Sequence, residues 1–119
     1  MKTLLIICSA TEAATGLALI IIPSIVTQLL LGVAVNGNAL TVSRLAGMCL
    51  ISLGIACWPG QIFNQPLRAM SFYNLLVAFF FIYIGLSSSL VGILLWPVAL
   101  LHLGFAVVLF RGLLNSKQN

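Results

Sequence analysis

Four long apolar stretches, almost free of charged residues, limit what this chain can fold into. They span residues 4–22, 41–58, 69–86 and 90–110. A helix rises about 1.5 Å per residue, so roughly 20 apolar residues cross a bilayer core of about 30 Å. The stretches also lack the alternation of polar and apolar residues that membrane β-strands need. The sequence therefore predicts an all-α integral membrane protein, a four-helix transmembrane bundle.

The composition excludes several other classes of protein. Only 5% of the 119 residues are charged and 62% are hydrophobic, whereas a soluble domain carries about 25% charged residues. A soluble enzyme and a disordered chain are both excluded. The net charge of +4 comes from five scattered Lys and Arg residues, which form no basic face. We therefore expect one transmembrane domain over residues 1–119 and no nucleic-acid partner.

The connections between the stretches differ in kind. Pro23 and Gly32 flank residues 24–31, and proline favours the first turn of a helix and glycine its end. We expect a short helix here, lying on the membrane surface. The third connection is nearly absent, so residues 69–86 and 90–110 are predicted to form a tight antiparallel hairpin.

A proline falls inside the fourth apolar stretch. Pro97 follows Trp96 directly. Within a helix, proline removes one backbone hydrogen bond and bends the axis. We expect a structural kink in the outer half of the fourth helix, with Trp96 near the interface.

The positive charges predict the orientation of the chain, because cytoplasmic loops carry an excess of Lys and Arg. With a cytoplasmic N-terminus, Lys2, Arg68, Arg111 and Lys117 lie inside and only Arg44 lies near the outer face. We therefore expect a multi-pass protein of the cell membrane with both termini in the cytoplasm.

Polar residues inside the membrane are the main candidates for function, because a central charge costs about 2.5–3.5 kcal/mol. Advancing each helix by about 100° per residue places Glu12, Asn74 and His102 on faces that carry small residues. Small residues mark close helix packing in membranes. Glu12 and His102 fall at a similar depth, and Arg44 reaches towards Glu12 if the first two helices are neighbours. We take Glu12, Arg44, Asn74 and His102 as candidates to bind a ligand or a proton.

Three interpretations of this polar layer remain open. In the structural one, Glu12 pairs with Arg44 or hydrogen-bonds to His102 and fixes the packing. In the functional one, a small polar cavity binds a proton, a cation or a lipid-like ligand. In the third, Glu12 contacts another subunit. The single His and three Cys residues have no metal-ligand spacing, so we expect no metal and no cofactor.

Several loose motifs resemble those of a known group of proteins. They are Gly16 followed by Pro23, Leu31-Gly32, and Arg44-Leu45-Ala46-Gly47 leading to Leu53-Gly54-Ile55-Ala56. With the helix layout, they make most of the chain similar to small bacterial four-helix membrane proteins of the DoxX-like type, which include uncharacterised families. The resemblance implies a four-helix bundle in the bacterial inner membrane. It also implies an accessory role beside redox or other membrane complexes, with no established catalytic residues.

A second resemblance rests on Glu12, within Ala10-Thr11-Glu12-Ala13-Ala14-Thr15-Gly16. Small multidrug-resistance transporters are also about this long, with four helices and one membrane-embedded Glu in the first. This resemblance implies that Glu12 binds cations in exchange for protons.

Two classes of function follow. We expect a small non-enzymatic membrane protein, either an accessory subunit or a binder of a hydrophobic ligand. The alternative is a proton-coupled exporter of lipophilic cations that uses Glu12. A membrane enzyme has little support, because the chain has no catalytic motif, one His and no Asp. Its partners are expected to be the lipid bilayer and either further copies of itself or a larger membrane complex.

Overall fold

The computed structural model describes residues 1–61 and 63–115. In that part of the chain it contains helices and no strands. The helices are α1 (Lys2–Ile21), α2 (Pro23–Leu31), α3 (Gly37–Ala56), α4 (Asn64–Ser87) and α5 (Leu95–Asn115). Four of them, α1, α3, α4 and α5, are long and apolar enough to cross a membrane. The predicted all-α class and the four membrane-spanning candidates are confirmed.

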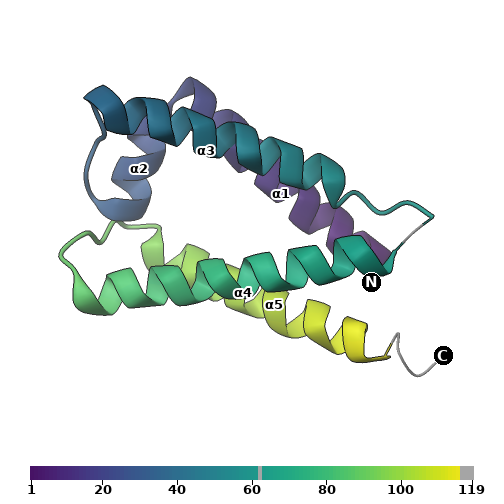
Figure 1. Cartoon of the computed structure of the whole chain (residues 1–119). Coiled ribbons are helices and arrows are strands. Elements are labelled where there is room, and N and C mark those ends of the chain that lie inside the picture. The colour runs from purple at the N-terminus through teal and green to yellow at the C-terminus, as the bar shows by residue number, and fades with distance from the viewer. Residues whose placement is uncertain (62, 116–119) are drawn as a thin grey trace.

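The long helices form two layers. Helix α1 packs mainly against α3, and α4 packs mainly against α5, with the two helices of each layer antiparallel (Figure 1). The short helix α2 joins α1 to α3 in the chain. It lies between the two layers, at the end of the bundle away from both termini (Figure 1). The molecule is elongated along the helix axes, with extents of 49 × 28 × 18 Å.

Glycines bring α1 and α3 into backbone contact. A Cβ atom added to Gly16 would lie 2.5 Å from the carbonyl oxygen of Gly47, and one added to Gly54 would lie 2.6 Å from that of Ser9. Both distances are shorter than any side chain tolerates, so only glycine fits. Gly47 and Gly54 of α3 therefore lie in the contact with α1.

A hydrophobic cluster closes the bundle at the end that carries the termini. It joins α1, the end of α3, α4 and α5, and all of its members are buried. They are Leu5, Cys8, Cys57, Leu67, Met70, Leu109 and Leu113. Elsewhere the two layers touch sparsely, so this cluster, which we call the terminal core, is the main apolar contact between them.

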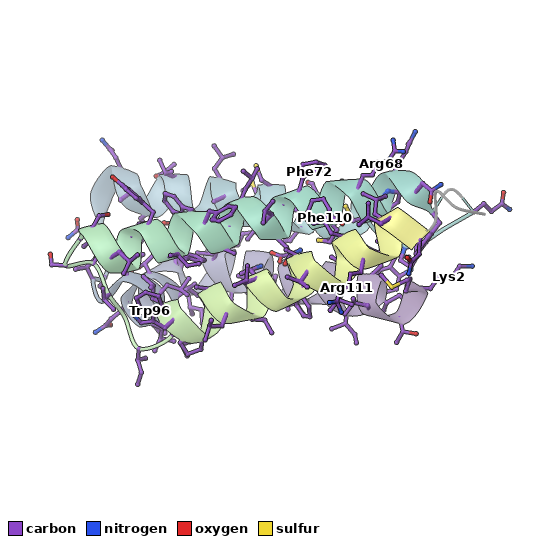
Figure 2. The ribbon with its side chains drawn as sticks, turned by 90° about the horizontal axis from the view of Figure 1, so that it is seen from below. Lys2, Arg68, Phe72, Trp96, Phe110 and Arg111 are labelled. Atoms are coloured by element: carbon purple, nitrogen blue, oxygen red, sulfur yellow. The ribbon has the colours of Figure 1, made fainter. Side chains whose placement is uncertain are left out.

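Positive side chains gather at the same end. Lys2, Arg68 and Arg111 lie towards one end of the bundle, whereas Trp96 lies at the opposite end (Figure 2). Lys117, which the sequence analysis counted with them, falls outside the described residues.

Helix α2 is hydrogen-bonded to the loop between α4 and α5. Proline at position 23 begins the helix, and Gly32 ends it with a φ of 74°. The carbonyl oxygens of Leu29 and Leu30 then accept hydrogen bonds from the N–H groups of Leu94 and Gly92, at 2.9 and 3.0 Å. These bonds satisfy carbonyls that a helix C-terminus leaves unpaired.

Two predictions about the fourth stretch are wrong. Helices α4 and α5 are antiparallel neighbours, as predicted, but the connection between them is not nearly absent, because residues 88–94 form a loop and α5 begins only at Leu95. Pro97 therefore lies in the first turn of α5, where an N–H has no partner within the helix, and it does not interrupt the helix. The apolar residues of the loop extend the hydropathy signal beyond the helix itself.

Two other helices begin earlier than predicted. Helix α3 starts at Gly37 rather than at residue 41, and α4 starts at Asn64 rather than at residue 69. Both added segments contain polar residues, so hydropathy located the apolar part of each helix and missed its polar first turn.

Candidate functional site

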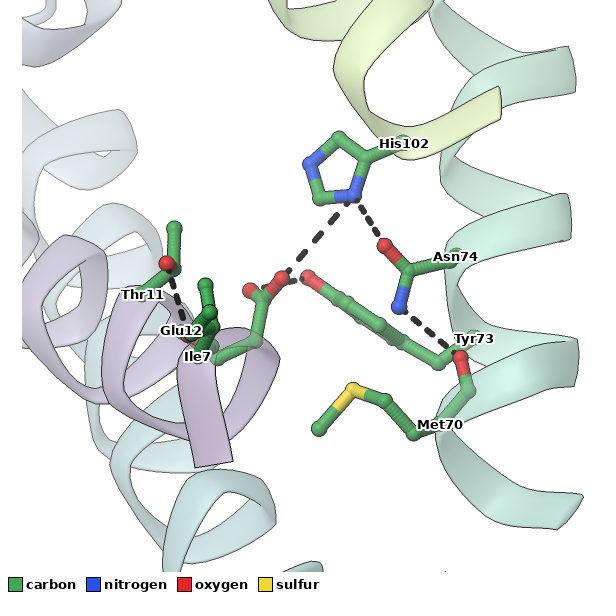
Figure 3. Close-up of polar contacts among 7 residues, drawn as sticks. All are labelled: Ile7, Thr11, Glu12, Met70, Tyr73, Asn74 and His102. Carbon is green, nitrogen blue, oxygen red and sulfur yellow. Dashed lines mark hydrogen bonds and ion pairs between the residues drawn. The ribbon is translucent and has the colours of Figure 1, made fainter. Parts of the chain in front are cut away.

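Three helices bring four polar side chains together between the layers. Glu12 comes from α1, Tyr73 and Asn74 from α4, and His102 from α5 (Figure 3). Glu12, Asn74 and His102 are 2%, 0% and 7% exposed, and Tyr73 is half-buried. We call these four residues the polar cluster.

A hydrogen bond links Glu12 to the opposite layer. The hydroxyl of Tyr73 donates to Oε2 of Glu12 at 2.8 Å. The other carboxyl oxygen, Oε1, lies 3.9 Å from Nδ1 of His102, which is ion-pair range but too long for a hydrogen bond. Glu12 of the α1–α3 layer is thus hydrogen-bonded to Tyr73 of the α4–α5 layer.

Asn74 orients the imidazole of His102. Its Nδ2 donates to the carbonyl oxygen of Met70 at 2.8 Å, and its Oδ1 lies 2.8 Å from Nδ1 of His102. Because the amide oxygen can only accept, Nδ1 carries the hydrogen in this contact. In a neutral ring the other nitrogen, Nε2, is then an acceptor.

Helical periodicity explains why these residues face inwards. The buried faces repeat at three- and four-residue intervals, as one side of a helix does. They are Cys8, Ser9, Glu12 and Gly16 on α1, Ser71, Asn74 and Ala78 on α4, and Ala99, His102 and Ala106 on α5. The predicted placement of Glu12, Asn74 and His102 on packing faces is confirmed.

Arg44 lies apart from the polar cluster. Helices α1 and α3 are neighbours, yet Arg44 is exposed and lines a separate small cavity with Ile21 and Pro23, near the end of α1. No ion pair joins Arg44 to Glu12 within the described residues. The prediction that Arg44 reaches Glu12 is wrong, because Arg44 sits beside the last turn of α1 and Glu12 lies more than two turns back.

Tyr73 is the member of the cluster that the sequence analysis missed. Its neighbour Phe72 points outwards and is 55% exposed. Two signals point to Tyr73. A phenol within a membrane helix needs a hydrogen-bond partner, and Tyr73, Val77 and Phe81 share one face at four-residue spacing.

A cavity of about 360 Å³ adjoins the polar cluster. Glu12, Tyr73 and His102 line it, together with Thr11 and Thr15 of α1. The rest of its lining is apolar and comes from all five helices and the loop before α5. These residues are Ala18, Leu19, Val26, Leu29, Leu30, Leu50, Val77, Phe80, Phe81, Leu94, Val98 and Leu101.

The terminal core closes the cavity towards the termini, and part of the cavity lining is exposed on the side of the bundle. The terminal core lies between the polar cluster and the end of the bundle that carries the termini. Phe80 and Leu101 line the cavity, yet they are 57% and 44% exposed on the outer surface of the bundle. The apolar wall of the cavity therefore continues onto the outer surface of the bundle at these two side chains.

The cysteines do not contribute to this site. Cys8 and Cys57 are buried in the terminal core, Cys49 is exposed on α3, and all three are free thiols. Within residues 1–61 and 63–115, no group of three or more His, Cys, Asp or Glu side chains is placed to hold a metal ion.

The fold and the site together define a small helical membrane protein with buried polar side chains at one end of an apolar cavity. No protein-family model, curated protein or solved structure matches the chain.

Proposed function

We propose that this protein binds a hydrophobic ligand within the membrane, in the cavity between its two layers. The observation that carries the proposal is the placement of Glu12, Tyr73 and His102 at one end of an otherwise apolar cavity. Binding sites for small molecules are typically of this kind, with volumes of about 300–1,000 Å³ and a few convergent polar groups. The exposed apolar side chains of Phe80 and Leu101 support access from the lipid phase.

The proposal includes a location and an orientation. We place the protein in the cell membrane with both termini in the cytoplasm and α2 at the outer surface. Lys2, Arg68 and Arg111 at the end that carries the termini support this orientation, because positive residues are retained on the cytoplasmic side. Arg44 and Trp96 then lie towards the outer interface.

The hydrogen bond within one chain favours a binding protein over an exporter. A proton-coupled exporter of lipophilic cations is expected to present an unpaired Glu12 between subunits. Here Oε2 of Glu12 accepts from Tyr73 of the same chain. An accessory role beside a larger membrane complex is compatible with ligand binding, because most of α3 faces outwards.

Photoaffinity labelling tests the proposal. The full chain in lipid nanodiscs is irradiated with an alkyl diazirine probe, and the labelled residues are mapped by mass spectrometry. We expect labels on cavity residues of α1, α4 and α5, and their loss on adding excess unlabelled alkyl chain. Ala18→Phe, which fills the cavity, should abolish these labels. Ala14→Phe, on the exposed face of α1, is the matched control and should retain them.

Uniform labelling of every outer helix face, unchanged by Ala18→Phe, would contradict ligand binding in the cavity. The same preparation tests the exporter. Proton release on adding lipophilic cations, lost in Glu12→Gln, would favour transport.

A further inference from the structure

Three polar atoms at the cavity make no hydrogen bond within the described residues. Oε1 of Glu12 lies 3.9 Å from the nearest cation-forming nitrogen, Nε2 of His102 makes no hydrogen bond, and neither does the hydroxyl of Thr15. By contrast, the hydroxyl of the neighbouring Thr11 donates to the carbonyl oxygen of Ile7 at 2.8 Å. Among the described residues, the fully enclosed side-chain oxygen or nitrogen that lacks a hydrogen bond is Oγ of Ser9, so the three atoms named here are not sealed off by protein. A molecule in the cavity can therefore reach them.

The unpaired atoms are mainly acceptors. Asn74 holds the hydrogen of His102 on Nδ1, which leaves the lone pair of Nε2 free. Figure 3 shows this second ring nitrogen turned away from Asn74. A doubly protonated ring would need a hydrogen-bonded counter-ion, and Oε1 of Glu12 is too distant to be one. Oε2 of Glu12 accepts from Tyr73, and in the ionised carboxylate Oε1 is a second acceptor.

From these contacts we infer that the ligand carries a hydrogen-bond donor at its polar end, which donates to Oε1 of Glu12 and Nε2 of His102. This inference rests on the proposed binding function and specifies its chemistry. A hydroxyl group and a protonated amine share the required property. A ketone, an ester or an ether lacks it, and leaves both acceptors unpaired.

The apolar wall specifies the remainder of the ligand. A volume of about 360 Å³ lies at the small end of ligand cavities, and its far end is lined by α2 and Leu94. This space suits a single short alkyl chain or a compact ring system rather than a phospholipid with two chains. The polar end then sits beside the polar cluster, and the apolar body points towards α2.

A series of alkyl probes with one chain length separates the alternatives. Radiolabelled decanol, decyl methyl ether and decylamine are equilibrated with nanodiscs that contain the full chain, and with empty nanodiscs to correct for partitioning into lipid. We expect decanol to bind at least about tenfold more tightly than the ether, because the ether leaves buried acceptors unpaired. Decylamine distinguishes the two kinds of donor. If decylamine binds more tightly than decanol, the ligand has a cationic head group. If it binds equally or less tightly, the ligand has a neutral hydroxyl group.

Variants show whether the acceptors cause the preference. Glu12→Leu and His102→Phe each remove one acceptor, so in each variant the ratio of alcohol to ether affinity should fall while the ether still binds. Asn74→Leu should lower the same ratio, because His102 loses the partner that holds its hydrogen on Nδ1. Arg44→Gln, outside the cavity, is the control and should leave the ratio unchanged.

The possible failures are distinct. Equal binding of decanol and the ether by the unmodified chain would overturn the donor requirement and leave the proposed function intact. Binding of neither probe above the empty nanodiscs would overturn both.

Discussion

The phenol oxygen of Tyr73 lies 2.8 Å from Oε2 of Glu12, and this hydrogen bond joins the two layers of the bundle. The contact between Asn74 and His102, also 2.8 Å, lies within one layer. The polar cluster therefore has one bond that crosses the bundle and one that orients a side chain. Since the layers touch sparsely beyond the terminal core, the crossing bond fixes their separation at the polar end of the cavity.

Removing the hydroxyl of Tyr73 should destabilise the bundle. Tyr73→Phe deletes the bond to Glu12, and side-chain hydrogen bonds in membrane proteins contribute about 0.6–1.7 kcal/mol. We expect a loss of this size in the free energy of unfolding, measured by titration with dodecyl sulfate in mixed micelles. Tyr83→Phe is the control, because the Tyr83 side chain is 67% exposed and its hydroxyl makes no hydrogen bond among the described residues. Equal losses in both variants would show that the bond contributes nothing.

The glycine contact between α1 and α3 should be sensitive to a single methyl group. Gly16→Ala places a Cβ atom 2.5 Å from the carbonyl oxygen of Gly47, so the helices must separate. Overpacking of this kind costs about 1–3 kcal/mol. Thermal unfolding in nanodiscs should show the loss. Gly104→Ala on α5, where no atom lies within 4 Å, should not lower the melting temperature, because alanine also favours the helix more than glycine does. An unchanged melting temperature in Gly16→Ala would show that α1 and α3 are not in backbone contact.

The attachment of α2 to the loop before α5 should depend on Gly92. A Cβ atom there would overlap the carbonyl oxygen of Leu29, beside the hydrogen bonds that Gly92 and Leu94 donate to α2. We expect Gly92→Ala to raise amide hydrogen exchange at residue 94 at least about tenfold, because local opening exposes this amide. Gly60→Ala, in a loop with no atom within 4 Å, should leave exchange at residue 94 unchanged. Unchanged exchange in Gly92→Ala would show that α2 is held by other contacts.

The proposed orientation can be measured with introduced cysteines. Gln65 is exposed at the start of α4, near the positive end, and Ser88 is exposed at the other end of α4. In a Cys49→Ser background, we expect a membrane-impermeant maleimide added to intact cells to label Ser88→Cys and not Gln65→Cys. Permeabilised cells should show both. The reverse pattern in intact cells would place the termini outside.

The fold and the site differ in how far the sequence predicted them. The four apolar stretches predicted four long helices, because apolar length is a local property of the chain. The third connection and the kink at Pro97 were predicted wrongly for the same reason. Hydropathy does not distinguish an apolar loop, such as residues 88–94, from the helix that follows it.

The candidate site residues were likewise predicted only in part from the sequence. Helical periodicity alone placed Glu12, Asn74 and His102 on buried faces, since a face is set by spacing within one helix. It could not say which faces meet. The pairing of Glu12 with Tyr73 rather than with Arg44 depends on how two antiparallel pairs of helices are stacked.

Local patterns in the sequence were thus enough to predict the all-α class, the four membrane-spanning candidates and the buried faces that carry Glu12, Asn74 and His102. The pairing of α1 with α3 and of α4 with α5, the place of Tyr73 in the polar cluster and the apolar cavity beside it became visible only in the folded chain. The reason is physical: burial within a helix follows from periodicity over a few residues, whereas a hydrogen bond between residues 12 and 73 exists only once distant helices have packed.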